Sequence, residues 1–384
     1  MDRKHYDEDH RAFGEAFRAF ADKELVPNYL EWERAGIAPR EIFAAAGRSG
    51  FLGMAVPEEH GGGGVEDFRF NQMLNEQIAL AGVTGAGLGI SLHNDTCLPY
   101  FLSFADDEQR KRWLPGIASG ELITAVAMTE PGAGSDLAGI RTNAKRDGDS
   151  YVVNGSKTFI TNGINADLVI TAVQTGGSSD DRRSGVSLLI LERGMPGFER
   201  GRNLDKLGLH SQDTAELSFT DVRVPVDNLL GEEGSGFAQL TQKLPQERTS
   251  IAVNGVAEAT AAFQETLQYV QDRKAFGKSI ASFQNSKFVL ADVATEIDVA
   301  QAFLDRCVDR LNAGELSAAD AAKAKYYSTE LQGRVIDKCL QLHGGYGYMT
   351  EYPISRRYAD ARVTRIYGGT SEIMKSVISK SYGL

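Results

Sequence analysis

The chain has 384 residues, of which 41 are Lys or Arg and 52 are Asp or Glu, so its formal net charge is −11. At roughly 150 residues per domain this length predicts two or three domains, and the excess of acid argues against a nucleic-acid partner or a polybasic membrane surface. No apolar run reaches the roughly 18 residues that cross a bilayer, and the cysteines and histidines lack metal-ligand spacing, so neither membrane insertion nor a metal site is expected. The acidic start MDRKHYDEDH is unlike a signal or transit peptide and predicts a cytoplasmic protein.

The first third of the chain, residues 1–123, predicts a helical domain. Phe13, Phe17 and Phe20 recur at helical spacing, and this helical segment is expected to end near Pro27. Further helical patterns occupy residues 41–47, 66–81 and 108–120.

Residues 124–233 change to a strand pattern and predict a middle β domain. Residues 151–153 and 157–161 flank Asn154-Gly155, a pair typical of a hairpin turn, since that turn needs positive φ at both central positions. Further β-branched or alternating runs lie at 168–173, 186–191 and 215–224. Because no helix separates these strands, we expect an antiparallel sandwich or barrel.

Residues 234–384 return to a helical period. The predicted helices cover 237–273, 283–312, 318–344 and 355–380, and Ser317 with Asp320 resembles a capping box. Four long amphipathic helices favour an antiparallel four-helix bundle. The predicted fold is therefore α+β, multidomain and mainly α.

The segment 127–139, AMTEPGAGSDLAG, lies where the helical region gives way to the β region. Its glycines and small hydroxyls would let backbone N–H groups approach a flat or anionic ligand closely. Its composition alone fits a domain-linking loop equally well.

Several motifs together resemble the acyl-CoA dehydrogenase family. MTEPGAGSDLAG at 128–139 is similar to the first family signature, and QLHGGYGY at 341–348 with IYGGTSEI at 366–373 is similar to the second. Between them stand NGSK, FITNG and DRKAFGK, in the family order. The resemblance covers nearly the whole chain and is nearest to the long-chain and isovaleryl-CoA dehydrogenase-like sub-group.

The resemblance implies FAD held between the middle and C-terminal domains of a homotetramer. By motif, the residues that meet the flavin or line its loop are Met128, Thr129, Gly134, Ser135, Phe159 and Thr161. Those that would contact the dinucleotide across a subunit boundary are Arg273, Phe276, Gln284, Gln341 and Gly345, while Thr370 and Glu372 match positions near FAD in the final helix.

Two of these residues also have simpler explanations. The forked guanidinium of Arg273 suits a pyrophosphate, but a solvated arginine at a helix end would look the same in sequence. Glu372 would also fit as a first-turn carboxylate that complements a helix dipole.

The implied reaction is α,β-desaturation of an acyl-CoA thioester. A carboxylate removes the α-proton while a hydride leaves the β-carbon for the flavin. The thioester oxygen gains negative charge and needs donors, one of which maps to the backbone N–H of Gly368. The residues expected on the substrate side are Ser135, Arg248, Tyr367 and Gly368. Electrons would pass to an electron-transferring flavoprotein.

The catalytic base departs from the commonest family pattern. Many members carry a glutamate directly after the tyrosine of the last motif, but Gly368 follows Tyr367 here. The sub-group places the base on the first long helix of the C-terminal domain, where this chain has LPQER at 244–248 and hence Glu247.

The residues around Glu247 support the same assignment. Leu240, Leu244, Glu247 and Ile251 fall on one helical face, and burial in that apolar stripe would raise the pKa of the carboxyl. Pro245 could shift this register. Alternatively, Glu247 pairs with Arg248 or a lysine on a mixed face.

Two alternative functions remain open on the sequence. One is another flavin enzyme on the same scaffold: an acyl-CoA oxidase, or a relative of flavin monooxygenases or nitroalkane oxidases. The chain length argues against the larger oxidases, which carry an extra domain. The other is a catalytically silent FAD- and acyl-CoA-binding protein, suggested by Gly368.

Overall fold

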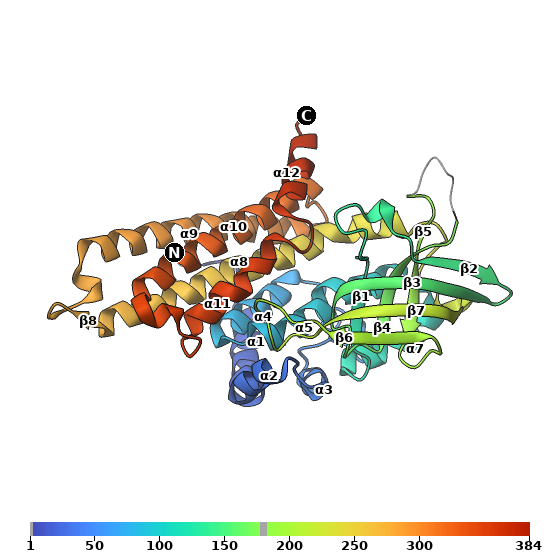
Figure 1. The fold of residues 1–384 in the computed structure, drawn as a ribbon, viewed down its shortest axis with the longest axis horizontal. Helices are drawn as coiled ribbons and strands as arrows, with labels where there is room; N and C mark the ends of the chain where they lie inside the picture. Colours follow the sequence, from blue (N-terminus) through green and yellow to red (C-terminus); the bar gives the residue numbers. More distant parts are fainter. Residues whose placement is uncertain (1–2, 177–182) are drawn as a thin grey trace.

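A computed structural model describes residues 3–176 and 183–384, which form helical, β and helical blocks in chain order (Figure 1). The first block contains α1 (Glu8–Phe20), α2 (Tyr29–Ala35), α3 (Glu41–Arg48), α4 (Phe68–Ala81), α5 (Thr84–Ser91), α6 (Leu98–Phe104) and α7 (Asp107–Ser119). The helices expected over 41–47, 66–81 and 108–120 occur within two residues of those bounds. The first α-helix instead ends at Phe20, and helical turns over Ala21–Leu25 and Val26–Asn28 lead through Pro27 into α2. No helix among the described residues is long and apolar enough to cross a bilayer.

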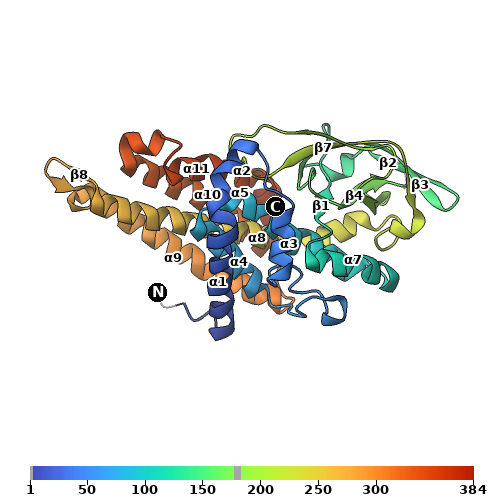
Figure 2. The same cartoon turned by 90° about the horizontal axis from the view of Figure 1, so that it is seen from below.

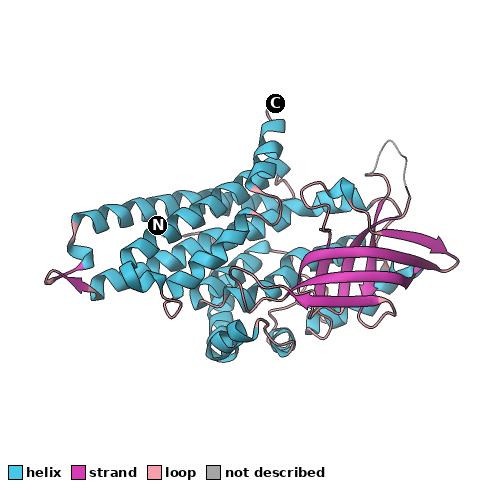
Figure 3. Ribbon diagram, in the orientation of Figure 1, coloured by secondary structure: helices cyan, strands magenta, loops and turns pink. Residues whose placement is uncertain are grey.

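The middle block is a seven-stranded sheet at one end of the molecule (Figure 3). Its strands are β1 (Thr124–Ala127), β2 (Asn143–Asp147), β3 (Ser150–Thr161), β4 (Leu168–Gln174), β5 (Val186–Glu192), β6 (Phe198–Asn203) and β7 (Thr214–Pro225). Most pairs are antiparallel as expected, but β1 and β2 each run parallel to β4. The long 128–142 loop joins β1 to β2, so these two strands need not form an antiparallel hairpin with each other.

The predicted hairpin at Asn154-Gly155 is wrong. β3 runs straight through both residues, and the turn between β2 and β3 instead follows Asp147, which pairs with Ser150. Gly155 lies where the register with β7 shifts, at φ 147°, and a Cβ there would come within 2.6 Å of the Cα of Thr142. Close approach of two chain segments, rather than a turn, explains this glycine.

The last block is a helical bundle beside the first (Figure 2). It comprises α8 (Gly236–Asp272), α9 (Gln284–Asn312), α10 (Ala318–His343), α11 (Pro353–Ala361) and α12 (Ser371–Lys380), with a small ribbon of β8 (Lys274–Ala275) and β9 (Lys278–Ser279) at its far end. α8 continues through Pro245, and Ser317 caps α10 by accepting a hydrogen bond from the Asp320 N–H.

The single helix expected over 355–380 is two helices instead. Gly368 and Gly369 adopt φ values of 62° and 94°, which end helical geometry between α11 and α12. Thr370 then caps α12 by accepting from the Ile373 N–H. The interruption turns the chain at 367–369 toward α8.

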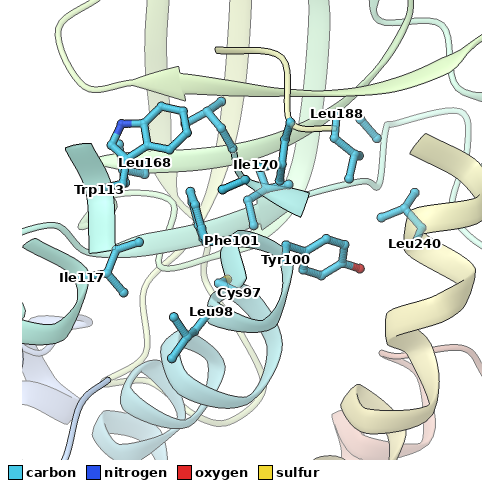
Figure 4. Close-up of a cluster of buried hydrophobic side chains, with 14 of the residues drawn as sticks. Cys97, Leu98, Tyr100, Phe101, Trp113, Ile117, Leu168, Ile170, Leu188 and Leu240 are labelled. Atoms are coloured by element: carbon cyan, nitrogen blue, oxygen red, sulfur yellow. The ribbon is translucent and has the colours of Figure 1, made fainter. Parts of the chain in front are cut away.

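A buried cluster fixes the β domain against the helices (Figure 4). Tyr100 and Phe101 from α6 pack with Leu168 of β4, Leu188 of β5 and Leu240 of α8. Because one core joins all of these elements, the start of α8 is held beside the sheet and the 128–142 loop.

Candidate active site

A cavity of about 430 Å³ lies where the three blocks meet. α5, the 128–138 loop, β3, α8 and the 367–369 loop all contribute to its wall. It gathers ten of the residues predicted from sequence: Met128, Thr129, Gly134, Ser135, Phe159, Thr161, Glu247, Arg248, Tyr367 and Gly368.

The cavity confirms the predicted face of α8. Leu240, Leu244, Glu247 and Ile251 all line it, so Pro245 does not disturb the register. A carboxylate thus stands within a largely apolar stripe.

Glu247 is buried, with 6% of its surface exposed. Its Oε1 accepts a hydrogen bond of 2.7 Å from the Tyr100 hydroxyl, and among the described residues it forms no ion pair with Arg248 or a lysine. Burial is the main cause that raises the pKa of Glu247 to about 7. A pKa near neutrality suits a general base.

The 367–369 loop borders the same cavity. The carbonyl of Gly369 accepts from Lys325 Nζ at 2.7 Å, and that of Gly368 accepts from Arg248 Nε at 3.5 Å. The Gly368 N–H donates to none of the described residues. A Cβ at position 368 would collide with Ile251 Cδ1, so the absent side chain makes room for Ile251 rather than directly for Glu247.

A buried ion pair shapes the 128–142 loop. Lys157 Nζ donates to the Met128 carbonyl at 3.0 Å and to Glu130 Oε1 at 2.8 Å, while the Glu130 carboxylate accepts from the N–H groups of Arg141 and Thr142. Burial lowers the pKa of Lys157 to about 8. The NGSK motif contains Lys157, but the sequence does not predict this ion pair, because the partners of Lys157 lie 27 and 29 residues earlier in the chain.

Lys157→Met is expected to destabilise the fold by about 3 kcal/mol, since it leaves the Glu130 charge buried without its cation. Chemical denaturation measures this loss. Lys145→Met, at an exposed position on β2, is the control and should stay within about 0.5 kcal/mol of wild type. Equal stability of both variants would contradict a structural role for the buried pair.

The cavity wall fits a planar ring that carries hydrogen-bonding groups. Phe159 is 68% exposed and holds its backbone at φ 60°, an uncommon conformation for a bulky residue. Thr129, Ser135 and Thr161 border the same space, and their hydroxyls form no hydrogen bond among the described residues. An exposed aromatic beside three free hydroxyls matches the needs of a flavin.

The remaining predicted residues lie elsewhere. Arg273, Gln341 and Gly345 border a separate hollow at the far end of the bundle, where the Arg273 guanidinium stacks on Tyr346 at 5.0 Å. Arg273 is 26 residues beyond Glu247, about 39 Å at the rise of an α-helix. These residues therefore lie outside the cavity of their own chain.

Phe276 and Gln284 lie near the same far end, on the tip of the ribbon and at the start of α9. Phe276 is 95% exposed with φ 52°, unusual for an aromatic side chain. Thr370 and Glu372 do not border the cavity: the first caps α12 and the second lies exposed in its first turn, where backbone hydrogen bonding lowers the pKa of the carboxyl.

The raised pKa of Glu247 has a consequence for stability. Its carboxyl ionises near pH 4.5 in the unfolded chain but with a pKa of about 7 in the folded protein. Its contribution to the free energy of unfolding is therefore complete below pH 4.5 and is lost as pH rises to 7. We expect Glu247→Gln to become more stable relative to wild type by about 3 kcal/mol over this window. Paired unfolding curves across pH measure the difference; one that does not change with pH would contradict the raised pKa.

Comparisons with known proteins agree with this architecture. The N-terminal, middle and C-terminal domain families of acyl-CoA dehydrogenases match residues 7–121, 125–222 and 234–383. The mitochondrial long-chain specific acyl-CoA dehydrogenase of Sus scrofa is 47% identical over 378 residues, which are 98% of this chain and 87% of that protein.

Two solved structures share the fold of this chain. An acyl-CoA dehydrogenase from Geobacillus kaustophilus is 48% identical with a TM-score of 0.97, over 99% of this chain and 100% of that one. A glutaryl-CoA dehydrogenase from Mycobacterium smegmatis, solved in complex with FADH2, is 26% identical with a TM-score of 0.91, over 99% and 95% of the two chains. The chain therefore belongs to the acyl-CoA dehydrogenase family of oxidoreductases.

Proposed function

We propose that the chain binds FAD in the central cavity and converts an acyl-CoA thioester to the trans-2-enoyl-CoA, with Glu247 as the base. The observation that carries this proposal is the buried carboxyl of Glu247, which faces the cavity together with the free N–H of Gly368. A base and an oxyanion donor on one cavity are the pair that α-proton removal needs.

The residues would act as follows. Glu247 takes the α-proton, and Tyr100 holds its carboxylate in place through the 2.7 Å hydrogen bond. The Gly368 N–H donates to the thioester oxygen as negative charge develops there. FAD, when bound, accepts the hydride that leaves the β-carbon.

Other residues would bind and orient the two ligands. Thr129, Ser135 and Thr161 offer hydroxyls to the cofactor, while Met128 and Phe159 cover its ring. Arg248 and Tyr367 border the space left for the substrate, and Arg248 also steadies the Gly368 carbonyl.

We further propose a homotetramer in which Arg273 and its neighbours contact the dinucleotide part of an adjacent subunit's cofactor. The roughly 39 Å between Glu247 and Arg273 along α8 supports this arrangement, because it places the arginine far from the proposed base of its own chain. The exposed Phe276 is a second support, since a partner subunit would cover it. Family membership supports an electron-transferring flavoprotein as acceptor.

Anaerobic titration with a panel of acyl-CoAs tests the proposal. Loss of the oxidised flavin absorbance with at least one saturated acyl-CoA, and appearance of the enoyl-CoA, are expected. Binding of acyl-CoA without any loss would favour a catalytically silent protein instead. Rapid reoxidation of the reduced protein by air would favour an oxidase over a dehydrogenase that uses a flavoprotein acceptor.

A further inference from the structure

The cavity has an open end and a buried end. Ser135, Asp136 and Thr241 are exposed at the first, whereas Asn75 and Asn254 are 2% and 7% exposed at the second. An acyl-CoA whose bulky CoA part stays outside would thus direct the tail of its acyl chain toward α4, α5 and the middle of α8. Polar side chains reach this buried end, although an acyl tail is a hydrocarbon.

Most polar groups at the buried end are satisfied by the protein. The Asp95 carboxylate accepts from Asn71, Asn75 and Ser250 at 2.6, 2.8 and 2.5 Å. The Ser91 hydroxyl in turn donates to Asn75 Oδ1 at 2.6 Å. The Asp95 carboxylate thus satisfies the side-chain donors of Asn71, Asn75 and Ser250.

Asn254 is the exception. Its side chain lines the cavity, is more than nine-tenths buried and forms no hydrogen bond with any described residue. The hydroxyl of Tyr367, which also lines the cavity, has no partner among those residues either. Because this amide faces the cavity, a ligand that displaces water from the buried end has to offer it a group that can hydrogen-bond.

Resting on the proposed function, we propose that Asn254 is a specificity residue that binds a neutral hydroxyl or carbonyl group on the distal part of the acyl chain. Asn254 follows Glu247 by seven residues, which places it two turns farther along the same face of α8, about 10.5 Å away. Each bond of about 1.5 Å advances an extended chain by about 1.3 Å, so about eight bonds separate the α-carbon from the bound group, which lies near carbon 10 of the acyl chain.

The charges around Asn254 exclude an anionic tail. Glu258 lies one turn farther on α8, and its carboxylate is held by the Thr84 hydroxyl and by Arg357. Arg357 also binds Glu265, so it is not available to a ligand. Asp95 accepts from Ser250, one turn before Asn254, so acids flank this position along α8 and a terminal carboxylate would meet like charge.

The test compares decanoyl-CoA, ω-hydroxydecanoyl-CoA and the dicarboxylic decanedioyl-CoA. Wild type is expected to use the hydroxylated substrate at least as well as decanoyl-CoA in kcat/KM, and the dicarboxylic one poorly. Asn254→Leu should lower the ratio of hydroxylated to plain substrate by about tenfold. Gln264→Leu, on the exposed side of α8, is the matched control and should leave the ratio unchanged.

Calorimetric binding to the Glu247→Gln protein gives a readout without turnover. The Kd of ω-hydroxydecanoyl-CoA should be no higher than that of decanoyl-CoA, and the Kd of decanedioyl-CoA should be higher. If both acyl-CoAs bind and react equally well, or if Asn254→Leu leaves the ratio unchanged, the polar subsite is wrong while the proposed function stands. If no acyl-CoA binds or reacts, both fail. If Asn254→Leu does not fold, Asn254→Val and the three substrates of the wild-type protein still test the polar subsite.

Discussion

Glu247→Gln is expected to slow the formation of enoyl-CoA at least about 100-fold. Glutamine keeps the shape of the side chain and can still accept the Tyr100 hydrogen bond, but it cannot take a proton. The variant should therefore fold, retain its cofactor and bind acyl-CoA. Anaerobic stopped-flow mixing with a good substrate measures the rate of flavin bleaching directly.

The matched control is Glu315→Gln, which removes a carboxylate from an exposed loop between α9 and α10. It should bleach at the wild-type rate. If Glu247→Gln also turns over normally, another residue is the base and the similarity to the long-chain sub-group does not extend to catalysis.

Arg273→Ala is expected to weaken cofactor binding by about 10- to 100-fold, because a forked guanidinium–phosphate contact is lost. The residue is exposed and its guanidinium lies over the face of Tyr346, so thermal stability of the cofactor-free protein should change little. Retention of FAD on dialysis, followed by absorbance, measures the effect.

Arg306→Ala removes an exposed arginine from α9 and serves as the control for charge alone. It should retain cofactor as wild type does. Unchanged retention by Arg273→Ala would overturn its assignment to a neighbour's cofactor, and a wild-type monomer that keeps one FAD per chain would overturn the subunit-spanning arrangement.

Periodicity and motifs predicted the parts of the site that are local in sequence. The stripe from Leu240 to Ile251 was readable because helical spacing alone places its members on one face. The contact of Tyr100 with Glu247 could not be predicted, because the two residues are 147 positions apart and only folding brings α6 against α8. Lys325, which fixes the Gly369 carbonyl, was missed for the same reason.

Two local signals were outweighed by tertiary contacts. Asn154-Gly155 has the composition of a hairpin turn, yet Gly155 serves a close approach to Thr142 within a continuous strand. The helical pattern over 355–380 spans two helices because two glycines with positive φ interrupt it. In both cases glycine was required for a backbone position that composition does not specify.

Removal of the α-proton by Glu247 is tested most directly by the pH dependence of kcat/KM. For wild type, kcat/KM should fall about tenfold for each pH unit below the pKa of about 7, because only the ionised carboxylate is a base. For Glu247→Gln the profile should be flat over the same range and at least about 100-fold lower. A wild-type profile that stays level down to about pH 5, or a variant that keeps the wild-type profile, would contradict it.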